Sequence, residues 1–252
     1  MSARVILHRG YIGKHPENSR PAFTAALSEQ RWFETDIRVS RDGVCFMIHD
    51  AEVDRLLDGS GCVSALTAAA LEQFRYRQDA GLRLVRLDSL CRLIAESERG
   101  SVVFLHIKRL EDLDPTLAVV REFPIRDRLR FFACDEITMA FLGRIRQNGA
   151  GYRVGLHVPD GSPHVSEPAF AKADFIWADE TAQPNITAEL VGLAHGLDKP
   201  VYAISPELIP ESVFNKDVPG RWRELLALGV DGICTDRPGE LDRVIGDGKF
   251  ES

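Results

Sequence analysis

Paired cysteines, an excess of basic charge and long apolar runs are all missing from this chain. The five cysteines are scattered, odd in number and form no Cys-x-x-Cys pair, which argues against a disulfide framework or a zinc knuckle. We expect reduced thiols and a cytoplasmic protein, since no signal-peptide core precedes the first apolar run. Acidic residues outnumber basic ones by 38 to 31, which argues against a nucleic-acid partner. No stretch is long enough for a membrane span.

The composition that is present is that of an ordinary globular protein. Hydrophobic residues make up 44% of the 252 positions and charged residues 27%, which are typical values for a soluble globular protein. The length fits one large α/β domain or two small ones. Nothing in the chain fixes the oligomeric state, and a homo-oligomer is one option. Low-complexity tracts and internal repeats are not evident.

Apolar runs alternate with helical patterns along the chain, which predicts a parallel sheet. Helices are expected after Ser19, over 64–74, over 137–147, from Thr187 to His195 with Gly196 just beyond, and over 222–228 closed by Gly229. Nine candidate strands stand against the eight places of an α/β barrel, and the link after Ile37 is too short for a helical crossover. Either two runs form a hairpin or one barrel helix is missing. The candidate strands are 5–7, 33–37, 44–48, 102–108, 130–134, 152–158, 175–178, 201–204 and 231–235.

Two carboxylates share one face of the second run. Glu34 and Asp36 are two positions apart, so an extended backbone points both side chains the same way. Such neighbours repel unless one keeps its proton or a cation lies between them. A hard divalent cation prefers oxygen ligands, which makes this pair a candidate metal site; a solvated strand face is the alternative.

Histidine and basic residues follow several strands. His49 ends the run after the Asp42-Gly43 turn, and histidine exchanges protons near neutral pH. His8 and Arg9 end the first strand, and the guanidinium of arginine suits phosphate. In the run 102–108 the side chains of His106 and Lys108 share a face. Barrel enzymes place their chemistry at such strand ends, although each of these residues alone could be an ordinary surface group.

The segment of about 51–90 is long for a connection between a strand and a helix. We expect a small insertion there, either a lid over a site or a plain surface excursion. The whole chain, 1–252, is then one domain that carries this insertion.

Taken together, these short motifs resemble the glycerophosphodiester phosphodiesterase family. They extend over almost the whole chain, and their order and spacing are specific although each is short. The matching pieces are His8-Arg9-Gly10, Pro16-Glu17-Asn18, Glu34-x-Asp36, Asp42-Gly43, His49-Asp50, Asp54-Arg55, Gly59-Ser60-Gly61 and the stretch from Gly229 to Pro238.

The resemblance implies a TIM (β/α)8 barrel of the phospholipase C-like type with a small insertion. It implies a metal-dependent phosphoric diester hydrolase of lipid and glycerol metabolism, which releases glycerol 3-phosphate and an alcohol. His8 and His49 would act as general acid and base. Glu34 and Asp36 would bind the metal, while Arg9 and Lys108 would hold the phosphate.

Two positions depart from the family pattern. His106 stands where the family has a metal-binding glutamate, so the site has one negative charge fewer. The family implies one divalent ion, Mg²⁺ or Ca²⁺ in the first place, while His106 makes Mn²⁺, Co²⁺ or Zn²⁺ better tolerated; His106 could instead contact substrate. Tyr202 stands where the family has tryptophan, in a position expected to contact the alcohol.

Two alternative functions remain open at this stage. The same fold and chemistry could serve a lysophospholipid or a sugar phosphodiester, or the barrel could bind a phosphorylated ligand without catalysis. The remaining polar candidates are given no role here. His157, His164 and His195 are expected at the surface or at helix ends, Trp177 in the core, and Asp179 and Glu207 near strand ends.

Overall fold

Eight parallel strands form a closed barrel in the computed structural model, which describes residues 3–148 and 151–247. β1 pairs with β2 on one side and with β9 on the other, which closes the sheet. The predicted TIM barrel is therefore confirmed. In order around the barrel the strands are β1 (Arg4–Leu7), β2 (Trp32–Val39), β4 (Val103–Ile107), β5 (Leu129–Ala133), β6 (Arg153–Val158), β7 (Phe175–Ala178), β8 (Val201–Ile204) and β9 (Gly232–Thr235).

The ninth strand, β3 (Cys45–Met47), pairs antiparallel with β2 and stands outside the barrel. The two strands form a hairpin around Asp42-Gly43, where the amide of Gly43 donates to the carbonyl of Ser40 at 3.0 Å. Gly43 has a φ of 86°, a conformation that glycine adopts without strain. Of the two options that the sequence left open, the hairpin is the correct one.

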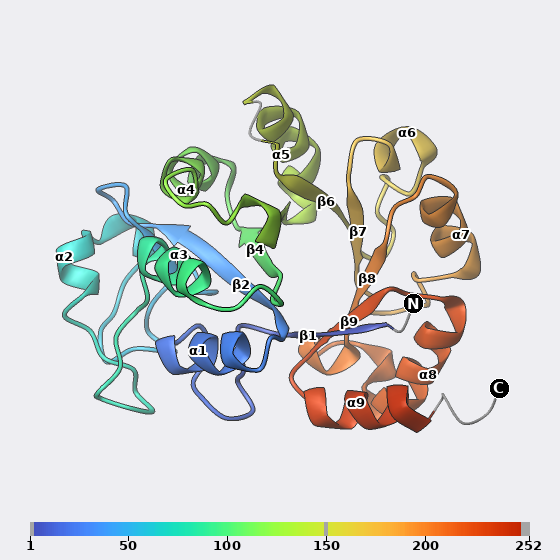
Figure 1. Cartoon of the computed structure of the whole chain (residues 1–252), viewed down its shortest axis with the longest axis horizontal. Coiled ribbons are helices and arrows are strands. Elements are labelled where there is room, and N and C mark those ends of the chain that lie inside the picture. Colours follow the sequence, from blue (N-terminus) through green and yellow to red (C-terminus); the bar gives the residue numbers. More distant parts are fainter. Residues whose placement is uncertain (1–2, 149–150, 248–252) are drawn as a thin grey trace.

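The helices surround the barrel (Figure 1). Ser19 caps α1 by accepting from the amide of Ala22, and Gly229 ends α8 with a φ of 91°, as predicted. The helices are α1 (Arg20–Ser28), α2 (Ala68–Leu71), α3 (Leu87–Glu96), α4 (Leu113–Val120), α5 (Asp135–Gln147), α6 (Glu167–Phe170), α7 (Ala188–Gly196), α8 (Val218–Leu228) and α9 (Pro238–Asp247), with short 3₁₀ turns at Val63–Ala65, Leu110–Asp112, Arg126–Arg128, Pro206–Leu208 and Val213–Asp217.

Two helix predictions need correction. The expected helix over 64–74 is a 3₁₀ turn followed by the single turn of α2, because Leu66 and Thr67 are extended and Thr67 caps a new helix by accepting from the amide of Ala70. Helix α7 includes Gly196 rather than ending before it. Thr187 caps it as predicted.

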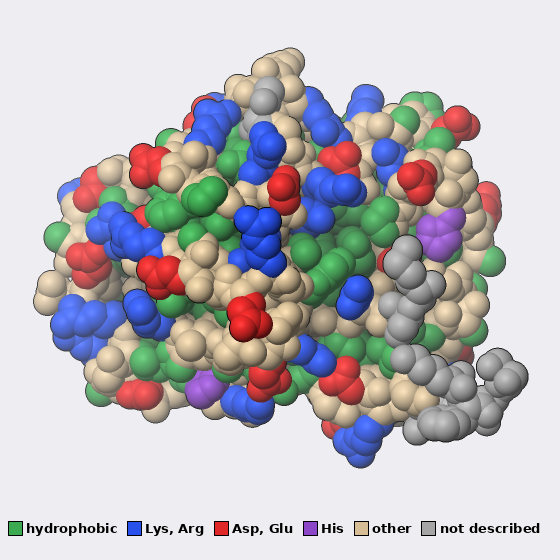
Figure 2. Space-filling view, viewed as in Figure 1, with side chains coloured by type: hydrophobic (Ala, Val, Ile, Leu, Met, Phe, Trp, Pro, Cys, Tyr) green, Lys and Arg blue, Asp and Glu red, His purple; other side chains and the backbone are tan. Residues whose placement is uncertain are grey.

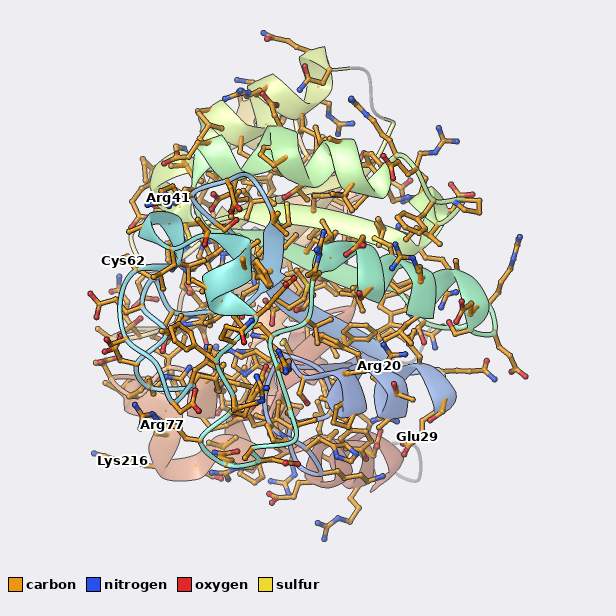
Figure 3. All side chains as sticks on the ribbon, turned by 90° about the vertical axis from the view of Figure 1, so that its left-hand side faces the viewer. Arg20, Glu29, Arg41, Cys62, Arg77 and Lys216 are labelled. Atoms are coloured by element: carbon orange, nitrogen blue, oxygen red, sulfur yellow. The ribbon has the colours of Figure 1, made fainter. Side chains whose placement is uncertain are left out.

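The excursion after β3 has a hydrophobic cluster of its own, built around Phe46, Leu57, Leu71 and Tyr76. It projects from one side of the barrel, beyond α3, with α2 at its edge (Figure 1). Figure 3 turns this side toward the viewer, with Cys62 and Arg77 at its outer face. Residues 87–90 of the predicted insertion belong to α3, so the excursion ends earlier than expected.

The described helices and one face of the surface can be compared with what the composition predicts. No helix within the described residues is long and apolar enough to cross a bilayer. Acidic and basic side chains are interspersed with hydrophobic ones on the face that Figure 2 shows.

Candidate active site

The carboxyl ends of the parallel strands meet at one mouth of the barrel, where a pocket of about 190 Å³ is found. Sequence alternation had placed polar side chains at several of these strand ends. The structure brings seven of the eight predicted site residues together in the wall of this pocket, while their chemical roles stay predictions. These seven are His8, Arg9, Glu34, Asp36, His49, His106 and Lys108.

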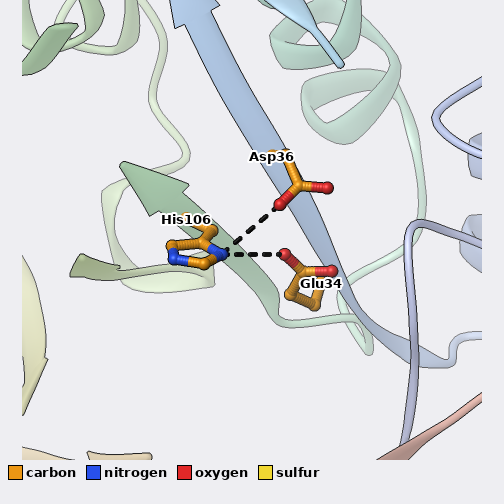
Figure 4. Close-up of side chains that lie close together, drawn as sticks. All are labelled: Glu34, Asp36 and His106. Carbon is orange, nitrogen blue, oxygen red and sulfur yellow. Dashed lines mark ion pairs between the residues drawn. The ribbon is translucent and has the colours of Figure 1, made fainter. Parts of the chain in front are cut away.

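The side chains of Glu34 and Asp36 from β2 and of His106 from β4 converge at the mouth of the barrel (Figure 4). One ligand atom of each lies within 4.8 Å of the others. The Nδ1 atom of His106 is 3.4 Å from Oδ1 of Asp36 and 3.8 Å from Oε1 of Glu34. The register pairs Asp36 with His106 across the two strands, so neighbouring backbones hold the group in place.

The protonation of His106 fits a cation site. Burial is the largest cause that lowers the pKa of His106 to about 3, so the imidazole is neutral. Its Nε2 faces the thiol of Cys134 at 3.4 Å, and its Nδ1 faces the ammonium of Lys108 at 3.0 Å. Since ammonium can only donate, Nδ1 of His106 accepts from Lys108, and the ring hydrogen is on Nε2. Three acceptor atoms then face one another, which is favourable around a cation.

The pKa values of Glu34 and Asp36 are shifted in opposite directions. Burial raises the pKa of Glu34 well above its usual range, and the neighbouring Asp36 raises it further. Burial opposes ionisation of Asp36 as well, but the Lys108 ammonium, with help from His106 and Arg9, holds the pKa of Asp36 well below its usual range. Both shifts favour the proton on Glu34 rather than on Asp36, and a further cation would take the place of that proton.

Asp36 also organises the two basic side chains of the pocket. Lys108 Nζ is 2.7 Å from Oδ1, and Nε of Arg9 is 3.4 Å from Oδ2. Asn18 donates to Oδ2 at 3.3 Å and accepts from the hydroxyl of Thr35 at 2.8 Å. Asp36 is 1% exposed, so these contacts lie in a medium that strengthens them.

His49 is held on both sides. Its Nδ1 lies 2.8 Å from Oδ1 of Asp50, and its backbone carbonyl accepts from Nε of Arg38 at 2.7 Å. Arg55 of the excursion binds the other oxygen of Asp50 and also donates twice to Glu17, at 2.9 and 2.7 Å. The Asp50 carboxylate therefore fixes the orientation of the His49 ring, and Nε2 of His49 is left for the pocket.

His8 has a carboxylate partner that the sequence did not reveal. Its Nδ1 lies 2.8 Å from Oδ1 of Asp236, which follows β9. Glu207 accepts from the hydroxyl of Thr235 and from the amide of Asp236, the latter at 3.2 Å. In the sequence, only the family motif from Gly229 to Pro238 drew attention to Asp236. Closure of the barrel is what places Asp236 beside His8.

The excursion supports the loop that carries Glu17 and Asn18. The hydroxyl of Tyr76 lies 3.1 Å from the backbone carbonyls of both residues. Tyr76 is 1% exposed, and Asn18 has a φ of 51°, which is unusual for a residue other than glycine. The tyrosine thus fixes a strained turn beneath Arg9 and Asp36.

Replacement of Tyr76 by phenylalanine is expected to lower the free energy of unfolding by about 1–3 kcal/mol, because a buried carbonyl loses its donor. Urea denaturation followed by circular dichroism measures this change. The matched control, Tyr11→Phe, removes a hydroxyl from a half-buried ring beside Lys14 and is expected to change stability by less than about 0.5 kcal/mol. Equal effects of both variants would contradict the role of Tyr76.

Tyr202 lies outside the pocket wall, contrary to the expectation that it contacts substrate. Its ring packs inside the barrel against Phe104 and Phe175, with centroids 5.2 and 5.6 Å away. A Cβ on Gly232 would come within 3.2 Å of the ring, so glycine makes room for it. Tyr202 therefore fills the barrel interior, and Ile204, two positions on, lines the pocket instead.

The opposite wall holds residues that sequence reasoning left without a role. His157 of β6, Trp177 of β7 and Asp179 line the same pocket, and Nε2 of His157 lies 3.2 Å from Oδ2 of Asp179. Alternation was the available signal for two of these residues, because positions 177 and 179 share one face of the chain at the end of β7. His164 and His195 do not line the pocket.

The motifs and the pocket agree with the comparisons to known proteins. The sequence model of the Glycerophosphoryl diester phosphodiesterase family matches residues 8–84, the part that supplies His8, Arg9, Glu34, Asp36 and His49. Over these residues the chain is similar to this family. The rest of the site, including His106 and Lys108, lies beyond the matched residues.

Relatives of the family are similar over part or all of the chain. The "Probable glycerophosphodiester phosphodiesterase 1" of Mycobacterium tuberculosis is 33% identical over 115 residues, which is 41% of this chain and 42% of that protein. The chain therefore matches less than half the length of this relative. A "Glycerophosphodiester phosphodiesterase" of Caldanaerobacter subterraneus is 26% identical over 97% of this chain and 98% of its own length.

Solved structures share the fold. A putative glycerophosphoryl diester phosphodiesterase from Silicibacter pomeroyi has a TM-score of 0.81 at 22% identity, covering 98% of this chain and 94% of that one. A phosphodiesterase from Oleispira antarctica, in complex with the product sn-glycerol-3-phosphate, has a TM-score of 0.74 at 21% identity and covers 97% of each chain. At these identities the likeness shows the barrel fold.

Proposed function

We propose that this protein hydrolyses glycerophosphodiesters to glycerol 3-phosphate and an alcohol. The observation that carries the proposal is one pocket with two histidines, each held by its own carboxylate, and two basic side chains beside a carboxylate pair. The match of residues 8–84 to the family model and the product named for the Oleispira structure support the same reaction. A phosphodiester resists attack because it is negatively charged, so cleavage needs charge neutralisation and two proton transfers.

Glu34, Asp36 and His106 would hold one divalent metal ion. Their three converging acceptor atoms and the raised pKa of Glu34 fit such an ion. When bound, it would supply Lewis acidity toward the phosphoryl oxygen. Mg²⁺ or Ca²⁺ suits the carboxylates, and the imidazole nitrogen of His106 widens the choice to Mn²⁺, Co²⁺ or Zn²⁺.

Arg9 and Lys108 would bind the phosphate. Both side chains line the pocket, and each forms an ion pair with Asp36. Cations fixed in advance stabilise charge that develops on the phosphoryl oxygens without reorganising during the reaction.

His49 would remove the proton from the attacking water, and His8 would give a proton to the leaving alcohol. Burial is the largest cause that lowers the pKa of His49, which keeps its imidazole neutral and ready to accept a proton at neutral pH. The carboxylate of Asp236 lies 2.8 Å from Nδ1 of His8 and fixes the orientation of that ring, which leaves Nε2 for the leaving group.

An assay for glycerol 3-phosphate tests the proposal. Purified protein is incubated with glycerophosphocholine and glycerophosphoethanolamine, with Mg²⁺, Ca²⁺, Mn²⁺, Co²⁺ or Zn²⁺ present in turn. Product release with at least one metal is expected. A folded sample that binds these diesters but releases no product with any metal would point to a binding barrel instead.

The metal preference itself can be changed at one position. His106→Glu restores a third carboxylate and is expected to raise Mg²⁺ affinity by about tenfold or more, because ligand charge sets the affinity of oxygen sites for hard cations. Affinity for Zn²⁺ is expected to fall, since the nitrogen ligand is lost. Isothermal titration calorimetry measures both. The control His106→Gln removes the nitrogen without adding charge, and an equal gain in Mg²⁺ affinity there would contradict the charge argument.

A further inference from the structure

Three side chains on the β6 and β7 side of the pocket have polar atoms that the proposed hydrolysis does not use. Trp177 is 1% exposed, and the His157 and Asp179 side chains are 13% and 17% exposed. Among the described residues, Nδ1 of His157, Nε1 of Trp177 and Oδ1 of Asp179 are buried and have no hydrogen-bond partner. Buried polar atoms are nearly always paired. Two of these atoms, Nδ1 of His157 and Oδ1 of Asp179, can accept from a ligand in the pocket.

The hydrogen bond between His157 and Asp179 determines which donor and acceptor atoms they can present to a ligand. A carboxylate only accepts, so the Nε2 of His157 that faces Oδ2 of Asp179 at 3.2 Å must carry the hydrogen. In the neutral imidazole this assignment leaves Nδ1 as an acceptor. His157 and Asp179 therefore present two acceptors and one negative charge, and Trp177 adds a single N–H donor.

The wall is held rigidly by its neighbours. Asn185 donates from Nδ2 to the backbone carbonyls of Val158 and Asp179, at 2.9 and 3.0 Å. The amide of His157 donates to the hydroxyl of Thr138 at 3.3 Å. These contacts fix the backbone that carries the two side chains, so less freedom is lost when a ligand arrives, which favours binding.

The pocket as a whole has opposite charges at its two sides. Arg9 and Lys108 face it from the ends of β1 and β4, beside the Glu34 and Asp36 carboxyl groups that would hold a metal ion, and Asp179 faces it from the end of β7. A substrate that carries a phosphate at one end and a cation at the other matches this arrangement. The volume of about 190 Å³ is below the roughly 300–1,000 Å³ of pockets for drug-sized ligands, which favours a small headgroup.

We propose that His157 and Asp179 form a subsite for a primary ammonium group on the alcohol part of the substrate, so that glycerophosphoethanolamine is preferred. The inference rests on the proposed hydrolysis for its phosphate end. An ammonium with N–H donors satisfies both acceptors and the charge.

Choline is a poorer match for the same wall. Its quaternary ammonium has no N–H, and proteins recognise it through the open faces of aromatic rings. Here the ring of Phe132 lies between those of His106 and Trp177, with centroids 4.3 and 4.5 Å away and interplanar angles of 17° and 24°. The facing surfaces of these rings are covered by one another.

Substrate ratios test the subsite. The unmodified protein is expected to give a higher kcat/KM for glycerophosphoethanolamine than for glycerophosphocholine or the neutral-alcohol diester glycerophosphoglycerol. Asp179→Asn keeps the shape but removes the charge, and is expected to lower the ethanolamine value by about tenfold or more, with a smaller loss for glycerophosphoglycerol. Glu211→Gln, an exposed position in the loop after β8, is the matched control and should leave the ratios unchanged.

A binding measurement separates this inference from the proposed reaction. Isothermal titration calorimetry should show tighter binding of phosphoethanolamine than of phosphocholine, and Asp179→Asn should remove the difference. A binding preference that Asp179→Asn removes, in a protein that hydrolyses no diester, would reject the proposed reaction and support the subsite. Equal binding of both ligands, or an equal loss of all three diester activities in Asp179→Asn, would overturn the subsite.

Discussion

Replacement of His49 by asparagine is expected to lower kcat for a glycerophosphodiester by about 10²–10⁴-fold, the usual contribution of one general acid or base. Asparagine can keep the hydrogen bond to Asp50 that His49 makes at 2.8 Å, but it cannot take up a proton. The phosphate contacts proposed for Arg9 and Lys108 are untouched, so KM should change far less than kcat.

The pH profile gives a second readout for His49. Burial is the largest cause that lowers the pKa of His49; Lys108 and Arg9 act in the same direction, and Asp36 opposes them. A base with a lowered pKa stays neutral further into acid, so kcat/KM of the unmodified protein should begin to fall only below the usual histidine value of about 6.5. The residual activity of His49→Asn should lack this acid limb.

His195 provides the control for this experiment. It also forms a histidine–carboxylate pair, 2.9 Å from Asp231, but it lies on an exposed helix end away from the pocket. His195→Asn should keep both kcat and the pH profile. If His49→Asn retained full activity, the proton-transfer role of His49 would be wrong.

Local periodicity was enough to predict much of this site. Alternation in β2 puts Glu34 and Asp36 on one face, and the ends of parallel strands must share one mouth. These two facts bring His106 and Lys108 to the same place, because β4 is the neighbour of β2 in the barrel. The prediction succeeded where the geometry depends on one strand or on the direction of its neighbours.

Tyr202 shows where periodicity fails. Alternation gives the face of a strand but not the depth of a side chain along the barrel axis. That depth depends on the stagger between strands, which pairs Tyr202 with Gly232 at the start of β9. Tyr202 therefore points into the barrel interior but lies below the pocket that Ile204 reaches.

Partners from distant parts of the chain were also beyond prediction. The pairs between His8 and Asp236 and between His157 and Asp179 join residues 228 and 22 positions apart. A single histidine in a strand is usually an ordinary one, and no local pattern marks its partner. The closed barrel decides which strand ends become neighbours, and so which histidines gain a carboxylate.

Replacement of Asp36 by asparagine is expected to have the other large effect, on metal binding and on catalysis together. The carboxylate is 1% exposed and lies within 3.4 Å of Lys108, Arg9 and His106. Asparagine has nearly the same shape, so the change removes a charge from the centre of the site. Divalent-metal affinity should fall by more than the roughly 10–100-fold that follows loss of an outer partner of a ligand.

The loss of charge should also be visible at Glu34. Asp36 is the second cause, after burial, that raises the pKa of Glu34, so removal of the Asp36 charge should lower that pKa. The site would then be left with one carboxylate and two basic side chains, which repels a divalent ion. Isothermal titration calorimetry with Mg²⁺ or Mn²⁺ measures the affinity, and release of glycerol 3-phosphate measures the activity.

Asp112 separates this effect from a general loss of stability. It is also fully buried and is bound to Arg109 at 2.7 Å, but it lies outside the pocket wall. Asp112→Asn should lower the unfolding free energy, because it removes the charge of a buried carboxylate that pairs with Arg109, yet leave metal affinity unchanged. If Asp36→Asn bound metal as tightly as the unmodified protein did, the three converging groups would not be the metal site, and the charge of Asp36 would serve Lys108 and Arg9 alone.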